Sequence, residues 1–290
     1  MKKAVSINNN KPRIKLKSTK KFNFVKQVIK ENNLNTVCEE ANCPNIYECW
    51  DRKTATIMIL GDICTRACGF CSVATGKPST DNSLEPFRTA MAVKKMNLDH
   101  VVITSVDRDD LKGDYGSSIW AETIKNIHDL VPHCSVEVLT PDFKGHKPSL
   151  LKVFKEKPEI FSHNVECVKR ISKKVRSQSN WDRSISVLKY SVENRLLTKS
   201  GMMVGLGEKF DEVISTMSEV AQTGVSIFSI GQYLQPTKNH LAVERFVSDK
   251  EFYDYKMIGL DMGFKIIESG PLVRSSYHAD EQAKKIVVKK

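Results

Sequence analysis

Cys64-Thr65-Arg66-Ala67-Cys68-Gly69-Phe70-Cys71 places three thiols within eight residues, directly after an apolar run from Thr54 to Leu60. The apolar run has the length and composition of a buried strand, and Gly61 opens the loop that follows it. Because the three thiolates share one loop, they can converge on one centre. Three protein ligands leave one iron of an iron–sulfur cluster free to bind a small molecule.

Two other interpretations of these thiols are open. Zinc sites usually combine paired C-x2-C or Cys/His motifs, and no second pair of that kind lies nearby. Buried structural thiols are also common, but Asp62, Thr65 and Arg66 are unusual residues for a core strand. The residues therefore favour an iron–sulfur cluster over both alternatives.

A second group of cysteines, Cys38, Cys43 and Cys49, has C-x4-C-x5-C spacing. On its own this spacing suits zinc or a structural role as well as a cluster. Beside the first triplet it indicates a second, auxiliary cluster. The second triplet supplies only three thiolates, so a fourth ligand comes from elsewhere or is absent. Cys134 begins a predicted strand and is expected to be a core thiol.

Composition narrows the class of protein. The chain has 290 residues, of which 40% are hydrophobic, enough for one large α/β domain or two smaller ones. Its net charge of +11 suggests an acidic partner, either nucleic acid or an acidic protein domain. Six of the eight cysteines lie between Cys38 and Cys71, which favours metal binding in a reducing compartment, the cytoplasm, over disulfides.

The sequence shows neither a membrane span nor a secretory signal. No apolar run approaches the roughly 20 residues that cross a bilayer. Residues 1–21 are Lys-rich without an apolar signal core, so we expect a disordered basic tail.

From Thr54 onward, strand-like and helix-like segments alternate. The predicted strands are 54–60, 100–106, 134–140, 160–166, 199–206, 226–234 and 264–270. The predicted helices are 24–30, 88–97, 117–131, 149–157, 182–194, 209–222 and 249–262. Such alternation predicts a parallel sheet of six or seven units with crossover helices, closed or partly closed into a barrel.

Polar residues follow nearly every predicted strand. In barrels of parallel strands, catalytic groups lie on the loops after the carboxyl ends of the strands. The polar segments are 64–71, 105–110, 141–143, 164–166, 205–208, 232–236 and 274–278. We therefore expect them to share one face of the protein, although polar loops are common on any surface.

The C-x3-C-x2-C spacing resembles the signature of the radical S-adenosylmethionine (SAM) enzymes, which use a reduced cluster to cleave SAM to a 5′-deoxyadenosyl radical. Longer motifs resemble one family among them, lipoyl synthase. These motifs are 40–50 (E-x-N-C-P-N-x-x-E-C-W), 58–62, 105–110, 163–166, 199–201, 231–237 and 270–277. The resemblance runs from about residue 22 to the end of the chain.

The resemblance implies an α/β fold, a partial (β/α)6 TIM-like barrel over residues 54–270. Extensions at 22–53 and 271–290 would carry the auxiliary cluster. It implies two [4Fe–4S] clusters, SAM as cosubstrate, and insertion of two sulfur atoms into the octanoyl chain of an octanoyl-lysine on a lipoyl carrier domain. One SAM is cleaved per sulfur, and the auxiliary cluster is the sulfur source.

The resemblance also implies roles for individual residues. The ligands of the SAM-binding cluster would be Cys64, Cys68 and Cys71, and those of the auxiliary cluster Cys38, Cys43 and Cys49. The fourth auxiliary ligand would be a serine of the Arg-Ser-Ser-Tyr motif, Ser275 or Ser276, and we favour Ser276. The positions that match SAM contacts are Ser105, Asn164, Glu166 and Arg183.

The implied partners are octanoylated lipoyl domains, either of 2-oxoacid dehydrogenase E2 subunits or of the glycine cleavage H protein. A flavodoxin- or ferredoxin-type electron donor and an iron–sulfur cluster carrier would serve the reaction. We expect a monomer that binds neither nucleic acid nor membranes. The alternatives are a zinc-bearing nucleic-acid-binding protein, suggested by the charge and the cysteines, and a biotin-synthase-like sulfur-inserting enzyme.

Overall fold

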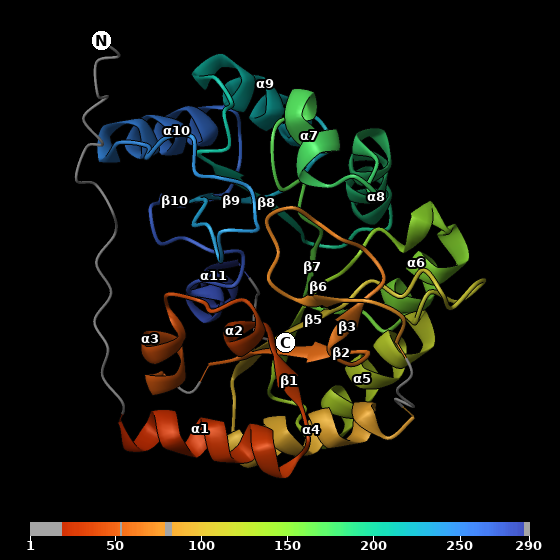
Figure 1. Ribbon diagram of the computed structural model, residues 1–290. Helices are drawn as coiled ribbons and strands as arrows, with labels where there is room; N and C mark the ends of the chain where they lie inside the picture. The colour runs from red at the N-terminus through yellow and green to blue at the C-terminus, as the bar shows by residue number, and fades with distance from the viewer. Residues whose placement is uncertain (1–18, 53, 79–82, 287–290) are drawn as a thin grey trace.

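The computed structural model describes residues 19–52, 54–78 and 83–286 (Figure 1). One eight-stranded sheet has the order β1-β2-β5-β6-β7-β8-β9-β10. Its strands are β1 (Asn35–Thr36), β2 (Thr56–Ile59), β5 (His100–Ser105), β6 (Ser135–Leu139), β7 (Ile160–Ser162), β8 (Thr198–Val204), β9 (Ile227–Gln232) and β10 (Ile266–Gly270). All neighbours from β2 to β10 pair in parallel, whereas β1 pairs antiparallel with β2.

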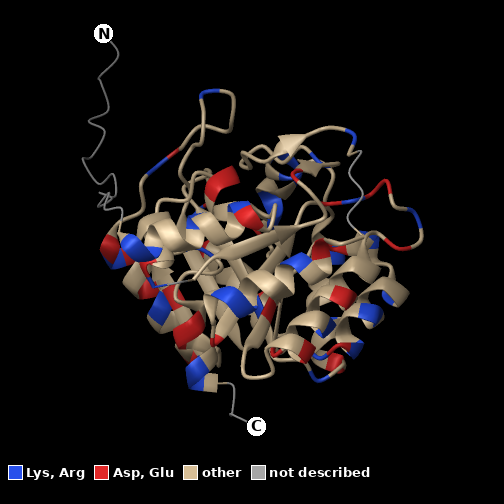
Figure 2. Ribbon diagram, turned by 90° about the horizontal axis from the view of Figure 1, so that it is seen from below, with Lys and Arg blue, Asp and Glu red and all other residues tan. Residues whose placement is uncertain are grey.

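The helices between successive parallel strands cover the outer side of the sheet, whereas α11 (Ala279–Ile286), after the last strand, packs against Ile160 of β7 and Ile227 of β9 (Figure 1). The longer ones are α1 (Lys20–Glu31), α4 (Glu85–Met96), α5 (Ser117–Leu130), α6 (Lys147–Lys155), α8 (Trp181–Glu193), α9 (Phe210–Ala221), α10 (Asp249–Asp261) and α11 (Ala279–Ile286). The shorter ones are α2 (Val37–Glu40), α3 (Ile46–Asp51), the 3-10 turn η1 (Phe143–Gly145) and α7 (Lys169–Val175). Figure 2 shows charges of both signs interspersed along the outer helices, while the strands carry few.

The prediction of an α/β fold with a mostly parallel sheet is confirmed. All seven predicted strands are present, and together they make up the parallel part of the sheet. β1 and β10 lie at opposite ends of the strand order, so among the described residues the ladder is open and does not close on itself.

The N-terminal boundary differs from the prediction. Residues 1–18 of the expected tail lie outside the described residues. Lys20 and Lys21, which were assigned to that tail, already belong to α1. The hydroxyl of Thr19 accepts a hydrogen bond from the backbone N–H of Phe22 and caps the helix, which explains why it begins there.

The chain after β10 crosses the inner side of the sheet and meets its other end. Gly231 in β9 leaves no space for a side chain, because a Cβ there would overlap the carbonyl oxygen of Val273. Further along, Thr56 in β2 donates a hydrogen bond of 2.8 Å to Ser276. The segment from residue 271 to α11 therefore links β9 to β2 across the interior of the open sheet.

A fully buried ion pair joins β6 to β8. Lys199 Nζ lies 2.9 Å from Glu137 Oε1, and neither side chain is exposed. His100 Nε2 is 3.8 Å from the same carboxylate. A charge in such a place is tolerated only with its partner, because the low-dielectric interior penalises an unpaired ion.

We expect Lys199→Ala to lower the free energy of unfolding by about 3–5 kcal/mol, because Glu137 would stay buried without its cation. Lys250→Ala is the matched control. It removes a pair with Asp254 on the surface of α10, where the Lys250 side chain is 84% exposed, and should cost under about 0.5 kcal/mol. Urea denaturation followed by circular dichroism measures both. Equal effects of the two substitutions would contradict the stabilising role of the buried pair.

Candidate active site

The loop with the first cysteine triplet follows β2 and lies between two short paired strands, β3 (Ile63–Cys64) and β4 (Ala74–Thr75). Its backbone is anchored by a neighbouring helix and a neighbouring loop. The N–H of Gly69 donates to Val175 O, and the N–H of Leu241 donates to Gly69 O, both at 2.9 Å. His240 Nε2 lies 2.9 Å from the carbonyl oxygen of Cys71. The end of α7 (Lys169–Val175) and the loop that follows β9 therefore hold the cysteines in place.

Arg66 fixes the same loop from inside. Its guanidinium is buried and lies 3.2 Å from Asp107, 2.8 Å from Asp109 and 2.6 Å from Asp142. These aspartates follow β5 and β6, so one cation joins three loops at the carboxyl ends of adjacent strands. The sulfur of Cys64 also takes part in this network. It accepts hydrogen bonds of 3.4 Å from the backbone N–H groups of Arg66 and Asp107.

A cavity of about 220 Å³ lies against this loop. All three cysteines of the first triplet line it, together with three of the predicted SAM contacts, Ser105, Asn164 and Glu166. Burial raises the pKa of Glu166, which lies in the segment after β7 and has a positive φ of 67°. Burial also lowers the pKa of His163 to about 4, so this lining residue is neutral at physiological pH.

Arg183, the fourth predicted SAM contact, is not among the lining residues of that cavity. Its guanidinium lies 3.0 Å from Asp142. Arg176 does line the cavity, is only 5% exposed, and donates to Asn164 O and Ser184 Oγ while its Nε has no partner. Sequence reasoning missed Arg176, because it ends a Lys-rich stretch that has the composition of a solvated surface.

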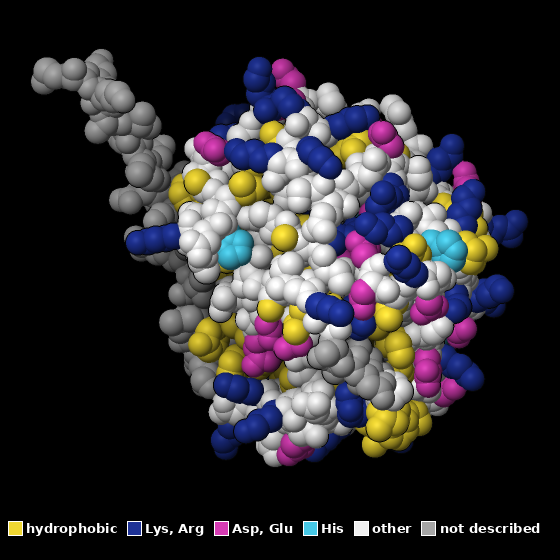
Figure 3. Space-filling model, turned by 45° about the vertical axis from the view of Figure 1, so that its right-hand side comes forward, with side chains coloured by type: hydrophobic (Ala, Val, Ile, Leu, Met, Phe, Trp, Pro, Cys, Tyr) yellow, Lys and Arg dark blue, Asp and Glu magenta, His cyan; other side chains and the backbone are white. Residues whose placement is uncertain are grey.

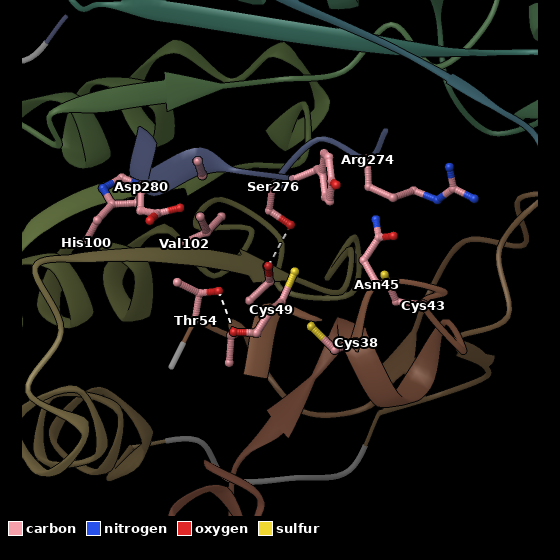
Figure 4. A pocket seen from close by; sticks show the side chains of 14 residues that line it. Cys38, Cys43, Asn45, Cys49, Thr54, His100, Val102, Arg274, Ser276 and Asp280 are labelled. Atoms are coloured by element: carbon pink, nitrogen blue, oxygen red, sulfur yellow. Dashed lines mark hydrogen bonds between the residues drawn. The ribbon is translucent and has the colours of Figure 1, made fainter. Parts of the chain in front are cut away.

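The second triplet is positioned by two short helices that the sequence patterns did not predict. Cys38 belongs to α2, which Thr36 caps by accepting the N–H of Glu39. Cys49 belongs to α3, and Cys43 lies in the turn between the two helices. A cavity of about 30 Å³ is lined by all three cysteines and by Ser276. In Figure 4 the three cysteine side chains surround this cavity, and the Ser276 hydroxyl reaches in from the C-terminal segment.

The two serines of the C-terminal motif have different partners. Ser276 receives the hydrogen bond of Thr56 and lines the cavity of the second triplet. Ser275 Oγ instead accepts a hydrogen bond of 2.6 Å from Asn164 Nδ2 and is not among the residues around that cavity. Arg274 lines the same cavity as Ser276, and its positive charge acts on Cys43.

A third cavity, of about 390 Å³, connects the two triplets. Cys71 of the first triplet and Cys38 and Cys43 of the second all line it. Its other walls include apolar side chains, among them Met202, Leu234 and Val273, and also Ser275, Ser276, Asn164 and Glu166. Members of both triplets, whose nearest cysteines are 15 positions apart in the sequence, thus face one largely apolar space.

Burial sets the protonation of the cysteines. It raises the pKa of Cys38 and Cys64 to about 11 and that of Cys49 and Cys68 to about 12, and it also raises the pKa of Cys43 and Cys71. The metal-free protein therefore carries neutral thiols, which must release protons when they bind metal.

Among the described residues, no three Cys, His, Asp or Glu side chains converge closely enough to hold a single metal ion. A [4Fe–4S] cluster has a different requirement, since each iron takes one protein ligand and the ligands surround the cluster. Three thiols around a cavity, with a hydroxyl on the remaining side, fit that requirement at the second triplet. At the first triplet three thiols face a cavity with no fourth thiol in its lining.

Comparisons with known proteins agree with this geometry. The family model of the radical SAM superfamily matches residues 58–220. The chain is 53% identical over 263 residues to the lipoyl synthase of Rubrobacter xylanophilus, covering 90% of this chain and 82% of that protein. It is 48% identical to the mitochondrial lipoyl synthase of Nematostella vectensis, covering 93% and 92% respectively.

Solved structures show the same fold at low sequence identity. Streptococcus suis SuiB bound to S-adenosylmethionine superposes with a TM-score of 0.58 at 12% identity, over 79% of this chain and 55% of that one. The hydrogenase maturase HydG gives 0.55 at 15% identity, over 85% and 56%. Within the described residues, every helix is too short or too polar to cross a membrane.

Proposed function

Because the chain belongs to the lipoyl synthase family of radical SAM enzymes, we propose that its two cysteine triplets hold two [4Fe–4S] clusters that act on one octanoyl chain. The chain is a sulfur-inserting enzyme that uses SAM and a [4Fe–4S] cluster and acts on lipoyl-domain substrates. When bound, one cluster supplies the electron that cleaves SAM and the other supplies sulfur. The family also disfavours a zinc-bearing nucleic-acid-binding protein.

On the SAM side, Cys64, Cys68 and Cys71 would each bind one iron and leave the fourth iron to SAM. Their common cavity and the N–H groups on Cys64 Sγ support this assignment. The lining residues Ser105, Asn164 and Glu166 would contact SAM, since amide and carboxylate groups suit ribose hydroxyls. Arg176, which lines this cavity whereas Arg183 does not, has a buried guanidinium nitrogen without a partner and would suit a carboxylate.

On the auxiliary side, Cys38, Cys43 and Cys49 would bind three irons and Ser276 the fourth. Their shared cavity supports this choice, and Ser275 is occupied by Asn164. Oxygen is a harder ligand than sulfur, so the Ser276 bond would be the weakest of the four. A displaceable ligand suits a cluster that gives up sulfur. The extension at 22–53 and the extension at 271–290 would thus complete one site beside the barrel region 54–270.

The cavity that both triplets share carries the proposal. An octanoyl chain is apolar and flexible, and this cavity offers apolar walls between the two proposed clusters. The residues around it would hold the reacting carbons near both clusters and exclude water from them. The main tasks of the protein itself are therefore to position the octanoyl chain and to exclude water from the reacting carbons.

The remaining partners follow from the same assignment. The substrates would be octanoylated lipoyl domains of 2-oxoacid dehydrogenase E2 subunits or of the glycine cleavage H protein. A flavodoxin- or ferredoxin-type protein would supply electrons, and an iron–sulfur carrier would rebuild the auxiliary cluster. We propose that the enzyme works as a monomer in the cytoplasm, where thiols stay reduced.

We expect association with an acidic lipoyl domain to slow by about tenfold between low and high salt, because screening weakens attraction between exposed charges. The net charge is +11, and Figure 3 shows Lys and Arg side chains spread across one face. Stopped-flow association with an octanoylated lipoyl domain at several salt concentrations measures this. Salt-independent association, or tighter binding to RNA than to the lipoyl domain, would contradict it.

Mass spectrometry of the carrier domain tests the function. The reconstituted protein, SAM and a reductant are incubated anaerobically with an octanoylated lipoyl domain. We expect two sulfur atoms to be added to the octanoyl chain. Cleavage of SAM without any gain of sulfur would contradict the proposal.

A further inference from the structure

Direct hydrogen bonds hold the Ser276 segment beside the second cysteine triplet, among them the bond from Asn164 Nδ2 to Ser275 Oγ. Thr56 donates one hydrogen bond to the Ser276 hydroxyl, and Asn45 Nδ2 donates one of 2.7 Å to the carbonyl of Leu272. The Ser276 segment lies more than 220 positions from Cys49 along the chain, so its place depends on interactions between the two ends of the protein. A group of charged residues at the edge of the cavity, of which Asp280 lines it, makes such interactions.

The first part of this group is an arginine fork. Arg52 follows α3 directly, three positions after Cys49. Its Nη2 lies 3.0 and 2.8 Å from the two carboxylate oxygens of Asp280, and its Nη1 lies 2.8 Å from Glu281. Both acids belong to the first turn of α11, which follows the Ser276 segment. The fork therefore joins the two helices that flank the proposed auxiliary site.

The second part joins the same two elements through a histidine. Glu48, next to Cys49 in α3, lies 3.0 Å from His278 Nε2. His278 Nδ1 is 3.4 Å from Glu281, and its ring stacks on Tyr277 at a centroid distance of 4.0 Å. We call the five residues Glu48, Arg52, His278, Asp280 and Glu281 the terminal clasp. Each pair on its own is partly exposed and weak, but a fork within a network gains geometric order.

The clasp is built without any group that binds iron. Its members alternate with the proposed ligands along both segments, since Glu48 and Arg52 flank Cys49, and His278 follows Ser276 by two positions. Its contacts also need no cluster to form. Whatever happens to the iron bond of Ser276, these ion pairs remain available to keep the two segments together.

We propose that Arg52 and Glu48 are positioning residues that hold the Ser276 segment against the second cysteine triplet independently of iron. This rests on the proposed function, in which Ser276 is a ligand of the auxiliary cluster. The clasp keeps the serine hydroxyl in place while that cluster is dismantled and rebuilt. The iron–oxygen bond can then be weak, because the ion pairs of the terminal clasp, and not this bond, hold the Ser276 segment in place.

Hydrogen–deuterium exchange of the cluster-free protein tests the clasp itself. Arg52→Gln should speed exchange in residues 271–286 by about fivefold, as expected when a small network is lost. Arg170→Gln is the matched control, because it breaks another bidentate pair, with Glu212 at 2.6 Å, whose partners lie on α7 and α9. It should leave exchange in 271–286 unchanged. Arg52→Glu should open the segment further, and adding Asp280→Arg should restore part of the protection.

Loss of iron to a chelator tests the link to the auxiliary cluster. The rate is measured in protein that lacks the thiols of the other triplet, so that only the auxiliary cluster is seen. Arg52→Gln should raise the rate about fivefold, and Arg170→Gln should not change it. Unchanged exchange in Arg52→Gln would overturn the clasp, and faster exchange with unchanged iron loss would overturn its role at the cluster.

The two proposals fail in different ways. Ser276→Ala should leave exchange of the cluster-free protein within about twofold of the parent, because the clasp is intact. If Ser276→Ala loses iron no faster than the parent, the ligand assignment fails even though the exchange data support the clasp. If Ser276→Ala itself opens residues 271–286 as much as Arg52→Gln does, the clasp is not what holds the segment.

Discussion

Replacing Cys64, Cys68 and Cys71 together by Ala is expected to abolish SAM cleavage, by at least about 1,000-fold, and to leave the auxiliary cluster in place. The three thiols line one cavity, and without them no iron can bind SAM or pass it an electron. The second triplet has its own cavity, and Ser276 would be its fourth ligand, so it should still be loaded. Release of 5′-deoxyadenosine measures cleavage, and iron and sulfide analysis measures the remaining cluster.

Cys167→Ala is the matched control for this variant. Cys167 is a free, fully buried thiol that does not line any of the three cavities described above. Its loss should leave both clusters and SAM cleavage intact. If the triple variant still cleaved SAM, or lost all of its iron, the division of the six cysteines into two separate sites would be wrong.

Ser276→Ala is expected to stop formation of the lipoyl product, by at least about 100-fold, while SAM cleavage continues. The hydroxyl lies beside the second triplet and is held by Thr56. Without it the proposed auxiliary cluster would lack its fourth ligand, whereas the other proposed cluster would be untouched. Ser276→Cys should keep a cluster and hold the fourth iron more firmly, because thiolate is the softer ligand, and should therefore also impair sulfur release.

Ser275→Ala separates the two serines of the motif. Its hydroxyl contacts Asn164 and does not face the second triplet's cavity, so we expect a milder loss of product. Product per SAM cleaved, measured by mass spectrometry and chromatography, compares the variants. If Ser275→Ala were inactive and Ser276→Ala normal, the ligand would be Ser275. If the double variant made product at the parent rate, neither serine would be a ligand.

The sheet could be predicted from the sequence because each strand is a local apolar pattern. The run from Thr54 to Leu60 contains β2, and the predicted segment 100–106 contains β5. In a parallel sheet, strands buried on both faces give continuous apolar runs. The polar loops after these strands then had to lie on one side, and the two cavities at the first triplet are indeed lined by residues from several of them.

The second site could be predicted only in part. The spacing of Cys38, Cys43 and Cys49 does not reveal that two short helices, α2 and α3, carry them, because helices of four to six residues have no periodic signal. The contact of Ser276 with this site depends on how the chain after β10 crosses the sheet. Thr56 and Ser276 are 220 positions apart, and no local sequence pattern indicates a contact over such a separation. It was expected from family resemblance rather than from residue patterns.

Charged residues were the hardest to place. Arg176 and Arg183 look alike in the sequence, yet Arg176 lines the cavity of the first triplet and Arg183 pairs with Asp142. Burial of a single arginine depends on the packing of several loops at once, and composition does not encode that. Arg52 likewise finds its partners in α11, at the opposite end of the chain.

Anaerobic iron and sulfide analysis of the reconstituted protein, with an absorption spectrum, tests the central claim most directly. The claim is that two cysteine triplets, each with its own cavity and joined by a third, hold two clusters. The account predicts iron and sulfide for two [4Fe–4S] clusters per chain, falling to one cluster when either triplet is replaced by Ala. A single cluster in the parent protein, bound zinc, or a protein without iron would contradict it.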